Sequence, residues 1–298
     1  MSRAASDTVG PGGEIAALWD ARIARAKELA AEHAQASEIL TFYAGLAGYQ
    51  QSLLRWRRRA SRQPRVTAGF AETVDLDAAS AAVPDFLAWL QETAPEPLAA
   101  TATRGVELEG WRQLMRGRLM QPDADVIGGP GEAGEANDAM TFVVEALLQP
   151  FVEAAAIDWR ADGHGTPRAP GVRPSRCPVC SGRPGVGILR EEGHGAKRTL
   201  LCALCLTEWE FLRVVCPACD EQRFDALPVY TADAFPHVRV DACDSCQRYL
   251  KTIDLTKHGL AVPLVDDIAS VALDLWADEQ GYRRLRANLL RTTRAAIR

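Results

Sequence analysis

The sequence lacks the features by which several common classes of protein are identified. It has no surplus of basic residues, since 34 lysines and arginines stand against 39 aspartates and glutamates and leave a formal net charge of -5. Nonspecific attraction to phosphate backbones depends on such a surplus, so this balance argues against nucleic acid and favours proteins as partners. Neither a GxxxxGKS/T phosphate loop nor an HExxH zinc-protease motif occurs.

Patterns of catalytic residues are equally scarce. None of the five histidines lies beside a serine/aspartate or cysteine/aspartate pattern that would indicate nucleophilic catalysis. These histidines are His33, His164, His194, His237 and His258. The sequence therefore gives no support to an enzyme.

Long apolar stretches are missing as well. Met1 to Gly13 hold no apolar run suited to a secretory signal, and we find no later run of roughly 18 apolar residues suited to a membrane span. We therefore expect a cytoplasmic protein without a membrane segment. Thiols stay reduced in that compartment, so the even number of eight cysteines indicates metal ligands and not disulfides.

Apolar residues at helical spacing fill the first half of the chain. We expect a flexible N-terminus over residues 1–13 and a helical domain over residues 14–162. Asp75 or Asp77 is suited to cap one helix, and Pro150 to kink the last one, because proline removes a backbone donor. The apolar positions are Ile15, Leu18, Ile23, Ala26 and Leu29; Ile39, Phe42, Leu46, Tyr49 and Leu53; Phe86, Leu87 and Leu90; Trp111, Leu114 and Met115; and Phe142, Val143, Leu147, Phe151 and Ile157.

A segment rich in glycine and proline, residues 163–174, predicts a domain linker, and all eight cysteines lie beyond it. After the cysteines, residues 263–298 predict a C-terminal helix that packs back on the helical domain. Its apolar positions are Ile268, Val271, Leu275 and Leu285, and an arginine-rich end follows.

The cysteines form four CxxC pairs, in which a backbone turn can direct both sulfurs at one ion. The pairs are Cys177/Cys180, Cys202/Cys205, Cys216/Cys219 and Cys243/Cys246. One isolated CxxC is equally typical of a redox dithiol or of two buried small residues. Four pairs within so short a segment favour two tetrahedral four-cysteine metal sites.

Internal repetition indicates which pairs share an ion. Loop-closure entropy separates the three possible pairings by less than about 1 kcal/mol, so it does not decide. Two similar units, residues 175–215 and 216–262, each open with CPxC and continue through a strand, a polar turn, a strand and a second CxxC. We therefore expect one ion on Cys177, Cys180, Cys202 and Cys205 and another on Cys216, Cys219, Cys243 and Cys246.

The residue types leave the metal open, because four thiolates accept zinc or a single ferric iron. Such a site carries a formal charge of -2 with zinc and -1 with ferric iron. The arginines near the pairs either balance this charge or are ordinary surface residues. They are Arg176, Arg183, Arg198 and Arg213.

A second cluster of arginines, Arg55 to Arg59 with Arg62 and Arg65, surrounds Trp56. It is suited to an acidic partner or nucleic acid, but it also stands where a helix should end, and cations favour that end.

The cysteine region resembles the formate dehydrogenase accessory protein family, FdhE, whose members carry CPxC, CxxC, CPxC and CxxC in this order. The resemblance extends to Glu208-Trp209 with Arg213, to Tyr249-Leu250-Lys251 and to the stretch Pro263 to Ala269. Phe42, Tyr43 and Gln50 look similar too. The resemblance therefore covers most of the chain and is weakest from about Gly69 to Trp159.

The resemblance implies a cytoplasmic factor that binds the catalytic subunit of a molybdenum- or tungsten-containing formate dehydrogenase during maturation. It also implies rubredoxin-like modules able to bind iron. Rubredoxin knuckles place glycine after the second cysteine, where a positive φ lets backbone donors reach sulfur. Here Ser181, Leu206, Asp220 and Gln247 follow, which favours metal binding over reversible electron transfer.

Together these observations predict an α+β fold with a helical N-terminal domain, two tandem rubredoxin-like or zinc-ribbon modules and a C-terminal helix. The leading hypothesis is a non-enzymatic maturation factor. The alternatives are a redox module acting on a partner protein and a zinc-ribbon nucleic-acid binder. Because structural metal supplies much of a ribbon's folding energy, we expect metal removal to unfold the residues after the linker while the helical domain survives. The sequence does not indicate an oligomeric state.

Overall fold

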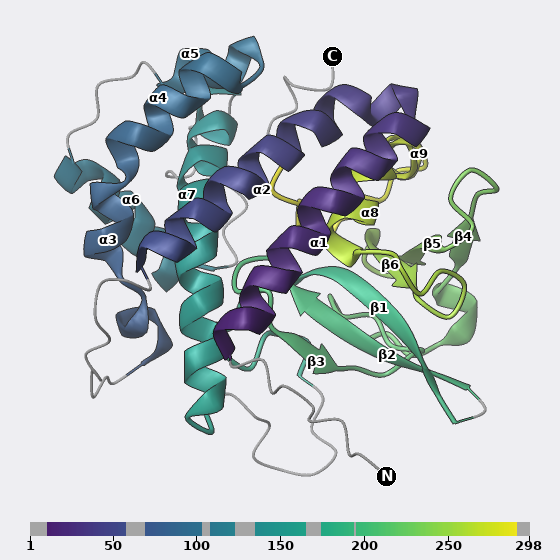
Figure 1. The fold of residues 1–298 in the computed structure, drawn as a ribbon. Helices are drawn as coiled ribbons and strands as arrows, with labels where there is room; N and C mark the ends of the chain where they lie inside the picture. Colours follow the sequence, from purple (N-terminus) through teal and green to yellow (C-terminus); the bar gives the residue numbers. More distant parts are fainter. Residues whose placement is uncertain are drawn as a thin grey trace, which may run out of the picture.

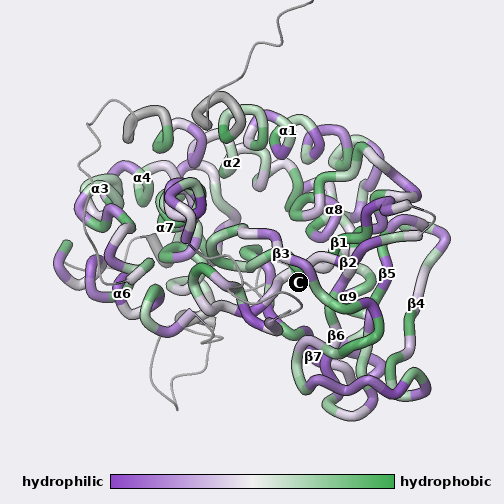
Figure 2. The backbone as a smooth tube through the Cα atoms, turned by 90° about the horizontal axis from the view of Figure 1, so that it is seen from below, coloured by the Kyte–Doolittle hydropathy of each residue, from purple (hydrophilic) through white to green (hydrophobic). Residues whose placement is uncertain are grey.

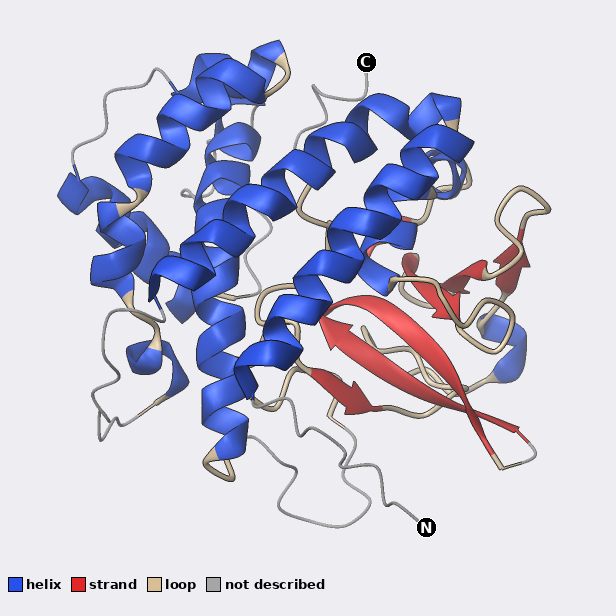
Figure 3. Cartoon of the chain, in the orientation of Figure 1, coloured by secondary structure: helices blue, strands red, loops and turns tan. Residues whose placement is uncertain are grey.

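The fold is described from a computed structural model over residues 11–57, 69–102, 108–122, 135–164, 174–193 and 195–290. The strands lie together beside the helices of the N-terminal part, and the C-terminal helices lie next to the strands (Figure 3). The α+β class and the helical N-terminal part are therefore confirmed.

The N-terminal part contains helices at each expected position. They are α1 (Pro11–Glu32), η1 (Ala34–Ala36), α2 (Ser37–Arg57), η2 (Phe70–Thr73), α3 (Leu76–Ala81), α4 (Val83–Thr93), α5 (Glu96–Ala102), α6 (Leu108–Met120) and α7 (Glu135–Ala161). α1 packs along α2 (Figure 1). α7 packs between α2 and α6, as the view from below shows (Figure 2).

The expectation that no apolar run is long enough to span a membrane is corrected by α7. Residues Ala139–Ala161 are long and apolar enough to span a membrane, with a mean hydropathy of 1.5. However, 83% of the 18-residue apolar window within this stretch is buried inside the fold, which is what a core helix requires. Pro150 lies inside α7, which continues on both sides of it.

The capping expectation is met by Asp75, but on a shorter helix than expected. Its carboxylate accepts a hydrogen bond from the backbone N–H of Ala78 at 3.0 Å and so caps α3. The apolar residues around Phe86 belong to the next helix, α4, which begins at Val83 with Pro84 in its first turn. Proline is favoured there because its missing N–H has no partner in a helix's first turn.

Both ribbons contribute to one sheet. Its strands are β1 (Pro184–Glu192), β2 (Gly195–Cys202), β3 (Glu208–Glu210), β4 (Val229–Thr231), β5 (Val238–Cys243), β6 (Arg248–Asp254) and β7 (Arg283–Arg284), and η3 (Phe224–Ala226) precedes β4. The order is β3-β2-β1-β6-β5-β4, with β7 beside β6. The antiparallel pairs β1/β2 and β4/β5 confirm the two predicted hairpins.

The two ribbons are joined by a parallel pairing of β1 with β6. Gly187 faces Thr252 at this junction, and a Cβ atom on Gly187 would lie 2.3 Å from the Thr252 hydroxyl. The absence of a side chain at Gly187 therefore lets the strands approach, because real atoms do not come that close.

The C-terminal segment differs from the single helix expected over residues 263–298. It forms α8 (Pro263–Ala269) and α9 (Val271–Glu279), which are separated at Ser270. The Ser270 hydroxyl donates back to the carbonyl of Asp266 at 2.8 Å. Gly281, with a φ of 85°, then turns the chain into β7, so Leu285 lies beyond both helices.

A single hydrophobic core extends through the helical part, the first ribbon and the C-terminal segment. It includes Trp111 of α6, Phe151 of α7, Cys202 of β2 and Ile268 of α8. A smaller core lies under the second ribbon and contains Val240 and Tyr249. The stretch of residues 163–174, which we expected to be a linker, therefore does not divide the molecule into two separate cores.

Several features named from the sequence lie outside the described residues. They are the N-terminus through residue 10, the arginines beyond Arg57, most of the expected linker, His194 and the C-terminal residues from 291 onward.

Candidate metal centres

The structure gathers the eight cysteine sulfurs into two groups of four. The first centre consists of Cys177, Cys180, Cys202 and Cys205, and the second of Cys216, Cys219, Cys243 and Cys246. Within each group all sulfurs lie within 4.8 Å of one another, and none of the eight cysteines forms a disulfide. The sequential pairing predicted from the internal repeat is confirmed.

The sulfur separations fit a tetrahedral ion. Metal–sulfur bonds of about 2.3 Å place the corners of a tetrahedron about 3.8 Å apart. In the second centre the Cys216–Cys246 and Cys219–Cys243 sulfurs are 3.8 and 3.7 Å apart. In the first centre the Cys177–Cys205 and Cys180–Cys202 sulfurs are each 3.4 Å apart. Both donor sets can therefore hold one metal ion each, and they fit zinc or iron.

Each cysteine pair sits on a tight turn whose backbone N–H groups point at sulfur. Val179 donates to the Cys177 sulfur at 3.4 Å, and Leu204 donates to the Cys202 sulfur at 3.4 Å. Ala218 does the same for Cys216 at 3.3 Å. Such donors stabilise thiolate charge and orient the ligands of a metal.

The residue after each second cysteine adopts the left-handed conformation, although none is glycine. The φ angles are 62° at Ser181, 55° at Leu206, 59° at Asp220 and 54° at Gln247. Among the described residues these are the only non-glycine residues with positive φ. The turn therefore imposes the knuckle geometry at all four positions at a cost in backbone strain.

The two centres differ in exposure. In the first centre Cys177, Cys202 and Cys205 are buried and Cys180 is half-buried. In the second, Cys219 is exposed. Cys246 is half-buried, whereas Cys216 and Cys243 are buried. The second centre is therefore the more accessible one.

Burial also affects the thiols of the first centre. Desolvation raises the pKa of Cys202 and of Cys205 well above the ordinary value of a thiol. These two groups therefore hold their protons when no ion is bound, and an ion must displace the protons to bind.

Of the four arginines considered from the sequence, Arg198 has the closest relation to a centre. Its guanidinium donates to the carbonyls of Leu212, Arg213 and Val215 at 3.2 to 3.4 Å. It also lies 3.1 Å from the Asp241 carboxylate. Burial lowers its pKa, and the nearby Cys216 and Asp241 favour its charge. Arg198 thus belongs to the first ribbon but neighbours the second centre. Arg176 and Arg213 are exposed.

A buried arginine near the first centre was missed by sequence reasoning. Arg118 of α6 pairs with Glu145 of α7 at 2.7 Å. Burial lowers its pKa, while the charge of Glu145 and, after that, the thiolate forms of Cys202 and Cys180 favour its charged state. Its position on a helix far from the cysteines in sequence gave no signal of this proximity.

Two family models match the part of the chain that holds the centres. Residues 176–213 match the one described as "FdhE, central domain", and residues 214–291 match "FdhE, C-terminal domain". The boundary between the two matches falls between Cys205 and Cys216, so each match contains one four-cysteine centre.

Proteins named "Protein FdhE homolog" are similar over larger parts of the chain. The one from Aquifex aeolicus is 35% identical over 161 residues, which are 53% of this chain and 54% of the relative. That from Pseudomonas aeruginosa is 32% identical over 215 residues, 69% of this chain and 66% of the relative. The chain thus spans about half of the first relative and about two thirds of the second. A relative from Pectobacterium carotovorum is 28% identical and matches 92% of this chain and 87% of its own length.

A solved structure extends the similarity to the whole fold. The crystal structure of the FdhE protein from Pseudomonas aeruginosa superposes with a TM-score of 0.62 and 26% identity, and covers 92% of this chain and 95% of the other. The overall fold of this chain therefore matches the fold of that protein over nearly its whole length. The chain belongs to the FdhE family.

Proposed function

We propose that this protein is a non-enzymatic accessory factor that binds the catalytic subunit of a formate dehydrogenase in the cytoplasm during that subunit's maturation. The observation that carries the proposal is membership of the FdhE family, including both cysteine-bearing parts of the chain. The acidic net charge of -5 agrees with a protein partner.

In this proposal the eight cysteines hold two ions with a structural role. A site closed by four sulfurs leaves no coordination position for a substrate, in contrast to catalytic metal sites, which keep one open. The first centre also belongs to the main core. The ions, zinc or ferric iron, would fix the ribbons against the helices and so create a rigid surface for the partner.

A pull-down with metal analysis tests this function. The tagged chain, expressed at native level in its own host, is expected to retain the formate dehydrogenase catalytic subunit and to contain two equivalents of metal. Cys202→Ser is expected to lose one equivalent and most of the bound subunit. Arg112→Ala, which alters an exposed side chain of α6, is the matched control and should retain both. Complete absence of the subunit from the unchanged bait would refute the function.

A second candidate, a rubredoxin-like redox module, is supported by the positive φ at all four knuckles and by the exposed Cys219. It requires ferric iron, which would give a coloured protein that bleaches reversibly on reduction. A colourless, zinc-loaded protein that still supports formate dehydrogenase maturation would exclude it.

A further inference from the structure

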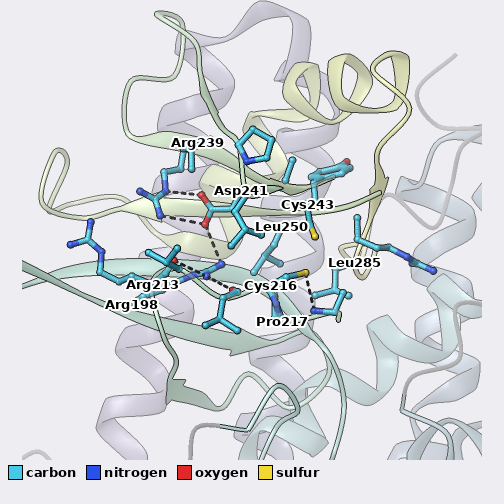
Figure 4. A pocket seen from close by; sticks show the side chains of 18 of the residues that line it. Arg198, Arg213, Cys216, Pro217, Arg239, Asp241, Cys243, Leu250 and Leu285 are labelled. Carbon is cyan, nitrogen blue, oxygen red and sulfur yellow. Dashed lines mark hydrogen bonds and ion pairs between the residues drawn. The ribbon is translucent and has the colours of Figure 1, made fainter. Parts of the chain in front are cut away.

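An open pocket lies between the two ribbons, beside the second metal centre. Its walls come from the connection between the ribbons, from the first knuckle of the second centre and from strands β4 to β6. In Figure 4 Cys216, Cys243 and Leu285 lie on one side and Arg198, Asp241 and Arg239 on the other. The arrangement brings an apolar floor, four arginines and one aspartate together.

The rim of this pocket is unusually apolar for an exposed surface. Val214, Phe224 and Val229 line it and are 47%, 82% and 52% exposed. Leu212, 49% exposed, stands two residues before Val214. Exposed apolar side chains scattered singly need no explanation, but a group of them around a pocket marks an interaction site. Of the nine large apolar side chains exposed in the described part of the chain, three belong to this rim.

The charge of the pocket is opposite to that of the whole chain. Asp241 is shared by Arg198 at 3.1 Å and Arg239 at 2.8 Å, which leaves one positive charge of this group unmatched by a carboxylate. Arg213 and Arg248 have no carboxylate partner among the described residues, although Arg248 donates to the carbonyl of Arg284. An ion in the second centre would add a negative charge of one or two with its thiolates. The lining stays positive in either case, and it suits an acidic partner.

The size of the pocket selects the kind of occupant. Its volume is about 80 Å³. Sites for cofactors and drug-sized ligands usually enclose roughly 300 to 1,000 Å³. The pocket is therefore too small for such a molecule, but it suits one apolar side chain that projects from a protein segment.

We propose that this pocket, with its rim of Val214, Phe224 and Val229, is the docking site for an acidic segment of the partner protein that inserts one apolar side chain. The carboxylates of that segment meet Arg213 and Arg239, and its apolar side chain rests on Leu250 and Leu285. The proposal rests on the proposed function, since the partner is the formate dehydrogenase catalytic subunit.

The affinity of the metal-loaded full chain for the purified catalytic subunit tests the docking site. Phe224→Ser is expected to weaken binding at least about tenfold, as truncation of an interface aromatic does. Leu260→Ser is the matched control, because Leu260 is 83% exposed but lies outside the pocket. Arg213→Glu should weaken binding and reduce its dependence on salt, whereas Arg112→Glu on the helical part should not.

Cross-linking identifies the occupant. A photoreactive p-benzoylphenylalanine at position 224 is expected to cross-link to a subunit segment with net negative charge, and the same group at position 260 should not. Equal losses of affinity for the catalytic subunit in Phe224→Ser and Leu260→Ser would overturn the proposal, and so would a cross-link to a basic segment. So would self-association of the chain through position 224. Failure of the unchanged chain to bind the subunit would instead overturn the proposed function, and the docking site with it.

Discussion

Arg25 of α1 and Asp266 of α8 form a buried ion pair with two hydrogen bonds, although 241 residues separate them in sequence. The nitrogen–oxygen distances are 3.2 and 2.7 Å. The same carboxylate also accepts a hydrogen bond from the backbone of Val262 and lies 2.8 Å from the ring of His237. One side chain thus connects the first helix, the second ribbon and the C-terminal segment.

Replacing Arg25 with alanine is expected to destabilise the fold by about 3 to 5 kcal/mol, because it leaves a buried carboxylate without its main partner. Denaturant unfolding of the metal-loaded protein measures this. Arg112→Ala removes the exposed pair between Arg112 and Asp77, 2.8 Å apart, and should cost less than about 1 kcal/mol. Equal costs for the two variants would contradict the role given to the buried pair.

The same carboxylate makes stability depend on pH. Burial alone would raise the pKa of Asp266, but hydrogen bonds from His237 and Arg25 outweigh it and lower the pKa below the ordinary value. A lowered folded-state pKa contributes stability that is fully present above the unfolded value of about 4 and is lost as the pH falls through the folded value. The stability difference between the unchanged protein and Asp266→Asn should therefore shrink below about pH 4. A difference that grows on acidification would contradict this assignment.

The two metal centres should release their ions at different rates. Because Cys219 is exposed while the first centre has three buried cysteines, a chelator is expected to remove one equivalent quickly and one slowly. A coloured chelator that reports released metal measures both phases. Cys219→Ser should abolish the fast phase. Cys180→Ser, the matched change in the first centre, should abolish the slow phase. A single phase, or the reverse assignment, would show that exposure does not control release.

Loss of the slowly released ion should also affect the helices. Cys177, Cys202 and Cys205 belong to the same core as α6 and α7, so the structure revises the sequence-based expectation that the helical domain survives metal removal. We expect far-ultraviolet circular dichroism to show loss of helix during the slow phase and little change during the fast one. An intact helical signal after both ions are gone would support the original expectation.

The left-handed residues predict an unusual effect of glycine. Ser181 is exposed, with a φ of 62°, so Ser181→Gly should relieve strain and stabilise the metal-loaded protein by about 0.5 to 1 kcal/mol. Ser52→Gly, in the exposed face of α2, should instead destabilise it by about 0.5 kcal/mol. This account would be contradicted if both substitutions changed the free energy of unfolding in the same direction.

Local patterns in the sequence predicted the helices, the two hairpins and the pairing of the cysteines, because each depends on spacing or on the repeat. The joining of the ribbons was not predictable in this way. It depends on the close approach of Gly187 to Thr252, and no local pattern marks two strands for parallel pairing. The break at Ser270 likewise depends on a side-chain bond to a preceding carbonyl, and not on apolar spacing.

Buried charges were the main feature that the sequence concealed. Asp266 and Asp267 are both buried. Asp267 lies 3.1 Å from Lys251 of β6 and 2.6 Å from Arg284 of β7, so cations from these two neighbouring strands neutralise it. Charged residues are normally read as surface residues, and only the tertiary fold shows which of them are paired inside.

The shared core has a consequence for synthesis of the protein on the ribosome. Chains usually begin to fold from the N-terminus while translation continues at about 5 to 20 residues per second. α7 ends at Ala161, whereas α8, which belongs to the same core, begins at Pro263. The helices synthesised first therefore keep apolar surface exposed for on the order of 5 to 20 seconds, until the segment that completes their packing emerges from the ribosome.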